Sequence, residues 1–502
     1  MRDAVRYRIK GTRTYVQPVA SVGGYDAASV APRLVRWQPP VSGPNNLLLG
    51  SLATLRARSR DSVRQNGYAE AGVETLVSNI VGTGIKPQFV TSDPEFNRQL
   101  ADLFLEWTDE ADADGRYDFY GLQALAARSM IEGGDCFTRL RARLPQDRLS
   151  VPFQLQILEG EFCPAYKNDG GIGSNQVIAG VEFDTIGRRF GYHLFASHPN
   201  DQAWGRLAQN VDTTLVPASE VTHLALTRRP GMVRGEPWLT RALVKMHDLD
   251  LYDDAQLTRQ QIAALFSGFV TEASPELGVE DEVFGGDVTT VPGVELASLE
   301  PGTMQELPSG KKIEWSEPPS PGDSYEAFVK QQMRAVAVSL GVLYEQLSGD
   351  YAGLSDRQFR VAANEFRRRC ATWQHHLVVF QWCRPVLRRW VELGILSGAI
   401  KPPAGVTLRM IARAKWVPQA WAYINPVQDV QAKQLEIRAG LASRSGTVSA
   451  DGDDVEQIDA EMAADNARAD RLKLVLDTDP RKTTSAGANA GQGDEPKPAS
   501  KN

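Results

Sequence analysis

Apolar residues recur at three- and four-residue spacing in several long segments, which is the period of a helix with one buried face. This pattern predicts helices over Leu47–Val81, from Asp93-Pro94 onward, and over Tyr120–Glu132, Pro237–Ser267 and Tyr325–Leu340. Later segments predict a long helix from Ser355 or Asp356 to Leu393, kinked at Pro385, and two shorter ones over Val427–Arg438 and Val455–Val475.

Short extended runs separated by turn residues fill the part of the chain between these two groups of helices. They predict strands at Cys136–Arg141, Phe153–Leu158, Ile178–Phe183, Arg189–Phe195 and Val221–Leu226, the third and fourth joined as a hairpin through Gly187. A second, smaller β region is predicted at Val288–Val291 and Lys312–Trp315. Because helices and strands come in blocks and do not alternate, the predicted fold class is α+β.

The two ends of the chain lack the pattern of a packed core. Residues 1–46 are rich in Gly, Pro, Ser and Arg, which predicts an extended arm. Residues 477–502 contain no Val, Ile, Leu, Met or aromatic residue, which predicts a disordered tail.

Composition places the 502-residue chain among ordinary globular proteins, with 42% hydrophobic and 23% charged residues. No apolar run is long enough to span a membrane, and the first residues do not resemble a signal peptide. Cys136, Cys163, Cys370 and Cys383 lack the spacing of a zinc site and are too few for a disulfide framework. A chain made in a reducing cytoplasm is expected.

Charge is unevenly distributed along the chain. Residues 1–64 hold eleven Lys and Arg against three Asp, a net charge of +8, whereas the whole chain carries −7. The remainder therefore carries −15. A basic arm on an acidic body can contact a polyanion, although a solvated tail explains the same pattern and is the favoured interpretation.

No motif indicates an active site or a cofactor site. Gly310-Lys311 and Val81-Gly-Thr-Gly84 both lack residues that a phosphate-binding loop requires, and no histidine pattern indicates a metal. Glu159 and Glu161, at the end of a predicted strand, are the best of several weak candidates for paired catalytic carboxylates. We expect no enzymatic activity.

The long helix after Ser355 combines many arginines with aromatic residues, a pattern that nucleic-acid-binding and subunit-contacting helices share. Phe359, Phe366, Trp373 and Phe380 recur every seven residues, which predicts a stripe that packs against the body of the protein. We therefore favour a packed helix with one solvated or subunit-facing side.

Several short segments, taken in order, resemble the lambda family of tailed-phage portal proteins. The similarity lies in Arg58-Ser-Arg60-Asp61, Asn79–Ile85, Glu132-Gly-Gly-Asp135, Leu155–Glu159, Val221-Thr-His223, Arg229–Trp238, Leu299-Glu-Pro-Gly302, Leu347–Tyr351, Trp421–Pro426 and Gly452-Asp453. The chain departs from the family at Ser355-Asp-Arg357, where a Tyr-Ser-Ser-x-Arg-like run is usual, and at Asn425, where Asp is usual. The resemblance extends from about residue 47 to residue 470.

The resemblance implies a ring, usually of twelve copies, at one capsid vertex of the virion, assembled in the cytoplasm of a host bacterium. Double-stranded DNA would enter and later leave through its channel, driven inward by the terminase large subunit. Capsid and head–tail connector proteins would be further partners, with no membrane and no cofactor. The acidic bulk agrees with a channel through which DNA slides, because many cations would hold its phosphates tightly.

The resemblance also implies a division of the protomer into regions. They are a basic arm (1–46), an α/β wing (47–236), stem helices with a clip insert (237–345, insert about 269–321), a channel loop with a long wing helix (346–404), a helical crown (405–476) and the tail (477–502). Asp350 and Tyr351, in the predicted loop Gln346–Leu354, are the candidates for residues that face DNA.

The sequence leaves two other functions open. One is a metal-dependent nuclease that uses Glu159 and Glu161 on DNA. The other is a head–tail connector that forms rings without being a portal.

Overall fold

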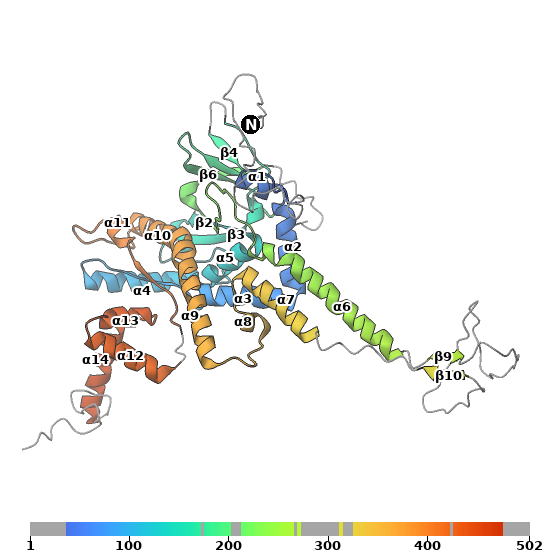
Figure 1. Ribbon diagram of the computed structural model, residues 1–502. Helices are drawn as coiled ribbons and strands as arrows, with labels where there is room; N and C mark the ends of the chain where they lie inside the picture. The colour runs from blue at the N-terminus through green and yellow to red at the C-terminus, as the bar shows by residue number, and fades with distance from the viewer. Residues whose placement is uncertain are drawn as a thin grey trace, which may run out of the picture.

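The computed structural model describes residues 37–171, 175–201, 212–265, 269–272, 311–314, 325–421 and 425–474. Blocks of helices and antiparallel sheets follow one another without alternation, so the α+β class is confirmed. The ribbon has a compact body from which one long helical arm projects (Figure 1). The predicted strand Val288–Val291, most of the predicted N-terminal arm and the predicted tail lie outside the described residues.

The first helical block contains more helices than the sequence pattern predicts. Leu47–Val81 is not one helix, because Asn66 is extended (φ −110°, ψ 117°) and its side chain caps the next helix through the N–H of Ala69 at 2.9 Å. The helix at Asp93-Pro94 and the one near Tyr120–Glu132 are confirmed. The block comprises α1 (Pro44–Leu49), α2 (Leu52–Gln65), α3 (Gly67–Ile80), α4 (Pro94–Glu110) and α5 (Phe119–Gly133).

Two antiparallel sheets follow α5. In the first, β2 (Asp135–Ala142) lies between β3 (Phe153–Glu159) and β8 (Val221–Ala225). The second has the order β4 (Gln176–Ile178), β5 (Val181–Phe183), β6 (Arg189–Leu194) and β7 (Thr214–Pro217). The predicted strand Ile178–Phe183 is wrong as a single strand, because Ala179 and Gly180 have φ angles of +53° and +80° and turn the chain between β4 and β5.

The arm consists of two helices that lead to and from a small β hairpin. Helix α6 (Leu243–Leu265) carries the chain outward to β9 (Phe269–Glu272), which pairs antiparallel with β10 (Lys311–Glu314) at the far end (Figure 1). Helix α7 (Tyr325–Leu340), with the predicted bounds, returns the chain to the body. Near the root of the arm, Tyr252 of α6 packs on Tyr325 and Phe328 of α7, with ring centroids 6.0 and 5.0 Å apart.

A long helix after the arm confirms the prediction in length but not in regularity. It comprises α9 (Asp356–Trp373), a π-helical run (Gln374–Cys383) and α10 (Arg384–Ser397). Ser355 caps its start. Pro385 follows directly after the π-helical run and lies inside the continuous helix, because Cys383 and Arg384 both keep helical backbone angles. The predicted loop Gln346–Leu354 is shorter than expected, because α8 (Tyr344–Ser348) occupies its first residues.

The π-helical run changes which residues of this helix are buried. Because π-helical hydrogen bonds join residues five apart, the seven-residue repeat drifts around the helix within the run. Phe366 is buried, as the stripe predicts, but Phe380 is 60% exposed, and Trp382 takes its place in the core. The prediction that Phe380 packs against the body is therefore wrong.

The last described segment contains α11 (Leu408–Ile411), β11 (Lys415–Val417), α12 (Pro426–Arg438), α13 (Arg444–Ala450) and α14 (Val455–Leu472). Strand β11 pairs with the distant β1 (Lys86–Gln88) and so ties this segment to the body. One large hydrophobic cluster joins α3, α4, α5, the root of the arm and the long helix. A smaller cluster lies between the two sheets. Among the described helices, none has the length and hydrophobicity needed to cross a bilayer.

Candidate functional site

A group of ionisable side chains is buried where the first sheet, helix α2 and the segment before the arm meet. Asp135 begins β2, Arg56 lies on α2, His223 on β8, and Arg234 on the segment that leads to α6. Their side chains are at most 4% exposed. We call these four residues the Asp135 hub.

Both oxygens of the Asp135 carboxylate are occupied by donors. Oδ2 accepts hydrogen bonds from Arg56 at 2.7 Å and from Arg234 Nε at 2.6 Å. Oδ1 accepts from the backbone N–H of Gly235 and from His223 Nε2, the latter at 3.3 Å. Burial by itself raises the pKa of Asp135, but Arg234, His223 and Arg56 outweigh it and hold that pKa well below its ordinary value. The carboxylate is therefore ionised, as a buried ion pair requires.

Arg234 connects the hub to three backbone segments. Its guanidinium donates to the carbonyl oxygens of Gly160 (2.6 Å), Cys163 (2.9 Å) and Ala179 (3.0 Å). Five hydrogen-bond donors in a planar fork allow one arginine to satisfy several acceptors at once. The segment that leads into the arm is in this way fixed to both sheets.

Two glycines allow this close approach. Gly134 has a φ of +85°, and a Cβ there would lie 2.5 Å from the carbonyl oxygen of Gly235. A Cβ on Gly235 would in turn collide with the carbonyl oxygen of Gly134. Close backbone contact and charge burial thus explain why glycine stands beside Asp135 and beside Arg234.

His223 lies between Asp135 and Arg189. Arginine has only donors, so Arg189, 2.6 Å from Nδ1, requires Nδ1 to be the acceptor and leaves the proton on Nε2, facing Asp135. Burial lowers the pKa of His223 from 6.5 to about 4, against the opposing effect of Asp135. The imidazole is therefore neutral in the folded protein at neutral pH.

We expect this histidine to make folding sensitive to mild acid. Above pH 6.5 both the folded and the unfolded chain hold it neutral; as the pH falls toward 4, only the unfolded chain takes up the proton, so stability is lost. The expected loss is about 2–3 kcal/mol over this interval. Urea unfolding across this pH range measures it.

The control pair for this measurement is His223→Gln and His375→Gln. The first removes the titrating group and should flatten the profile between pH 6.5 and about 4. His375 is exposed, so His375→Gln should leave the profile as in the parent protein. A profile that stays steep in His223→Gln contradicts the assignment.

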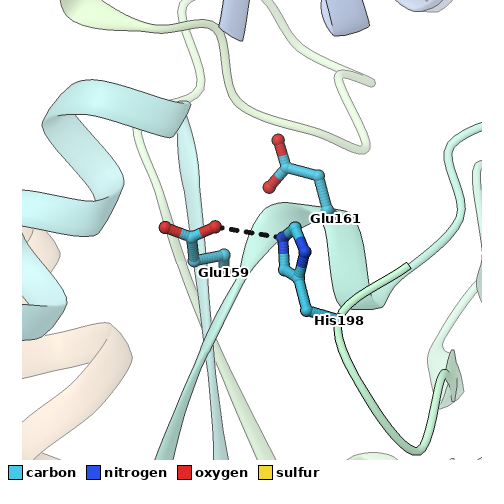
Figure 2. A group of neighbouring side chains, drawn as sticks. All are labelled: Glu159, Glu161 and His198. Carbon is cyan, nitrogen blue, oxygen red and sulfur yellow. Dashed lines mark ion pairs between the residues drawn. The ribbon is translucent and has the colours of Figure 1, made fainter. Parts of the chain in front are cut away.

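Glu159 and Glu161, the predicted carboxylate pair, lie close together beside His198 (Figure 2). One ligand atom from each of the three residues lies within 4.8 Å of the others, a spacing that a metal ion could bridge. Figure 2 shows His198 aimed at Glu159, with Nε2 and Oε2 3.2 Å apart. The sequence therefore predicted the proximity of the two glutamates but did not indicate the histidine.

One arginine already forms ion pairs with both carboxylates. Arg60 of α2 contacts both oxygens of Glu161, at 2.7 and 2.9 Å, and lies 3.2 Å from Glu159. Burial raises the pKa of Glu161, but the hydrogen bond from Arg60 and the charges of Arg56 and Arg60 lower it further than burial raises it. A divalent cation would have to displace this guanidinium. The arrangement is that of an ion-pair anchor between α2 and the end of β3.

Asp350 and Tyr351 lie in the loop between α8 and α9, bracketed by Gly349 and Gly353 with φ of +69° and +75°. The Asp350 carboxylate has partners within the same chain. Its Oδ1 accepts a hydrogen bond from the Ala352 N–H at 3.0 Å, and its Oδ2 lies 3.2 Å from Lys330 Nζ. The Ala352 N–H and then Lys330 lower the pKa of Asp350. Tyr351 is 56% exposed. The role of both residues toward DNA stays a prediction.

The sequence does not indicate that Arg56 and Arg234 belong to a common site. Arg234 stands out only as part of the segment Arg229–Trp238, and nothing in the sequence pairs it with Asp135, 99 residues away. The sequence by itself does not distinguish a buried arginine from a solvent-exposed one. The only available signal is the placement of Asp135 and Arg234 beside glycine.

Comparison with known proteins agrees with the sequence resemblance. Residues 31–374 match the family model described as phage portal protein, lambda family. The probable portal protein of Halomonas phage phiHAP-1 is 25% identical over 436 residues, covering 84% of this chain and 81% of that protein. Portal protein B of Escherichia phage lambda is 21% identical over 472 residues, covering 86% of each.

A chain in the solved structure of the neck of a native gene transfer agent particle, computed with C12 symmetry, is similar to this one. It is 16% identical, with a TM-score of 0.43, and the match covers 84% of this chain and 98% of that one.

The family match defines the class of protein. Its range covers well over half of the 502 residues and includes the Asp135 hub and the loop with Asp350. The class is that of phage portal proteins, which are structural components rather than enzymes. Within that class, the chain belongs to the lambda family.

Proposed function

We propose that copies of this chain, twelve as is usual for the family, close into a ring at one vertex of a phage capsid. Double-stranded DNA passes through the ring during packaging and ejection, and the tail attaches there. The observation that carries the proposal is the family match over residues 31–374. Assembly takes place in the cytoplasm of the bacterial host. The partners are the terminase large subunit, which supplies the energy, and the capsid and head–tail connector proteins.

The shape of the protomer supports this proposal. The arm of α6 and α7 extends beyond the body (Figure 1), and the exposed residues of α6 include Val244 (68%), Leu251 (55%) and Leu257 (59%). Apolar side chains on a projecting helix are unfavourable in water and suit side-by-side packing of arms in a ring. In the division proposed for the protomer, this arm is the stem and clip.

Ring assembly is tested with the purified full chain by native mass spectrometry and negative-stain imaging at several salt concentrations. We expect closed rings with an axial channel, and Leu251→Glu should reduce the ring fraction severalfold while leaving the protomer folded. Leu396→Glu, on a side chain 75% exposed at the end of α10, is the matched control and should assemble normally. A parent protein that stays monomeric at every concentration contradicts the proposal. A ring without a channel wide enough for duplex DNA would favour a connector.

The loop with Asp350 and Tyr351 is the proposed DNA-facing element of the channel. Tyr351 is exposed and contacts Phe359 only at the ring edge, with centroids 6.2 Å apart, so its removal costs the protomer little. We expect Tyr351→Ala to assemble into rings but to lower in vitro DNA packaging severalfold. Tyr166→Ala, at a tyrosine 78% exposed elsewhere on the body, is the control. Normal packaging by Tyr351→Ala together with Asp350→Asn would place the DNA-facing residues elsewhere.

We further propose that the chain catalyses no reaction. The nuclease alternative needs free carboxylates at Glu159 and Glu161, and the contacts of Arg60 with both argue against it.

A further inference from the structure

A row of arginines lies on one face of the first sheet, apart from the Asp135 hub. Arg139 and Arg141 occupy alternate positions of β2, and Arg143 continues the row just beyond its end. Alternate residues of a strand point to the same face, about 7 Å apart. This face begins with Asp135 of the hub and continues with Phe137, both of which are buried. Arg139, Arg141 and Arg143 form its other, partly exposed end, and we call these three residues the arginine row.

The arginine row has neutral partners only. Arg141 donates through Nε and Nη2 to Gln156 Oε1, at 2.8 and 2.5 Å, and Arg143 donates through Nε to Gln154 Oε1 at 2.7 Å. Among the described residues, neither of these nor Arg139 forms an ion pair. Burial, followed by the positive charges of Arg139 and Arg143, lowers the pKa of Arg141. The folded chain thus keeps like charges together. Gln156 and Gln154 orient two of the guanidiniums, and the Nη1 groups of Arg141 and Arg143 have no hydrogen-bond partner among the described residues.

A cavity of about 580 Å³ opens beside the row, lined in part by Arg116, Arg141 and Arg143. Two acidic residues, Asp112 and Asp114, also line it. The Asp112 carboxylate is already used, because it accepts from the backbone N–H groups of Asp114 (3.0 Å), Arg116 (2.9 Å) and Tyr117 (3.1 Å). Within the part of the chain that the structure describes, neither aspartate forms an ion pair with these arginines. The three arginines of the lining outnumber the two aspartates, so the lining keeps a net positive charge of one.

We propose that the arginine row and Arg116 bind the phosphate groups of a polyanion. A linear row of guanidiniums with regular spacing fits a linear series of phosphates, and arginine binds phosphate oxygens in pairs through its planar fork. The glutamine contacts orient the guanidiniums before binding, which lowers the ordering cost. Tyr117, 47% exposed beside the cavity, offers a ring to a neighbouring base or sugar.

The phosphates can come from a nucleic-acid backbone or from free phosphate compounds. An acidic protein segment is the competing class of ligand. The arginine row favours phosphates, because arginines at regular spacing along one strand match the repeating phosphates of a backbone better than one or two carboxylates. This site lies on the sheet of the body and not on the loop with Asp350. It does not depend on ring formation.

The test is the binding of a fluorescein-labelled 20-base-pair duplex, followed by anisotropy over a range of NaCl concentrations. The variant Arg139→Gln/Arg141→Gln/Arg143→Gln should bind more weakly, with a log K against log[salt] slope smaller by about 0.9 for each phosphate that the variant no longer neutralises. The control Arg98→Gln/Arg388→Gln/Arg438→Gln removes equal charge from α4, α10 and α12. Any contribution of the basic N-terminal arm is common to all three proteins and does not affect the comparison.

Competition distinguishes the sources of the anion. Inorganic phosphate or ATP that displaces the duplex from the parent protein at millimolar concentration would indicate a site for free phosphates, whereas displacement only by a second duplex indicates a backbone site. Either result supports phosphate recognition. Equal salt slopes for the row variant and the control overturn the proposal. It is also overturned if the row variant loses binding of a poly-aspartate peptide but keeps binding of DNA. Ring imaging of the row variant separates this outcome from a failure of assembly.

Discussion

Asp135→Ala is expected to lower the free energy of unfolding by about 3–5 kcal/mol, because it leaves buried cations without their counter-charge. Arg56 and Arg234 would remain enclosed, with side chains 4% and 0% exposed and no carboxylate between them. Arg234 also holds three backbone carbonyl groups, so its displacement would loosen both sheets and the segment that enters the arm. This is the largest effect that we expect from any single carboxylate.

The measurement is chemical unfolding of the variant and the parent at neutral pH, with intrinsic fluorescence as the signal. Asp61→Ala is the matched control, because Asp61 pairs with Arg64 at 2.5 Å but both side chains are at least 60% exposed. Exposed pairs contribute about 0–1 kcal/mol. If Asp135→Ala does not accumulate as folded protein, Arg56→Gln, which removes one of the two cations, provides a milder variant. If Asp135→Ala and Arg56→Gln each lowered the free energy of unfolding by less than about 1 kcal/mol, a structural role for the hub would be contradicted.

Trp382→Ala should destabilise the protein by about 3–5 kcal/mol, the usual range for a large aromatic side chain removed from a core. Trp382 is fully buried, and its indole N–H donates to Thr138 Oγ1 at 2.9 Å. It also stacks on Phe119, with ring centroids 5.3 Å apart. The residue therefore joins the long helix to both β2 and α5.

Phe380→Ala is the control within the same helix. Phe380 is two residues away and 60% exposed, so its removal should change the stability of the protomer by less than about 1 kcal/mol. The difference between the two variants, measured by urea unfolding, tests the rotation that the π-helical run produces. If Phe380→Ala lowered the free energy of unfolding more than Trp382→Ala, the result would support the seven-residue stripe and contradict the burial that the structure shows.

Local features of the sequence predicted most of the helices and strands. The bounds of Tyr325–Leu340 are the same in the structure, and Asp93 caps α4 as the Asp-Pro sequence indicates. These features depend on residues a few positions apart, which sequence spacing records directly. The failures are also local in cause: Asn66 divides one predicted helix, and the turn at Ala179-Gly180 divides one predicted strand.

The functional residues were predicted less completely. Glu159 ends β3 and Glu161 lies in the 3₁₀ turn that follows, so their proximity followed from the sequence. Arg60, which pairs with both and is 101 residues from Glu161, could not be predicted in this way. The arginine row was not predicted, although its alternating positions are visible in the sequence. What distinguishes it is that no described acidic residue forms an ion pair with it, and that depends on how β3 and residues 112–117 pack against β2.

The order of the motifs alone determined the family, and the periodicity of apolar residues alone determined the α+β class. Only the tertiary structure decided which charges are buried together, because Asp135 is separated from Arg56 and Arg234 by 79 and 99 residues and meets them through packing. It also decided that Phe380 faces outward while Trp382 faces the core. The physical reason is common to both: burial and ion pairing depend on distances in space, which a linear spacing of residue types records only within one helix or strand.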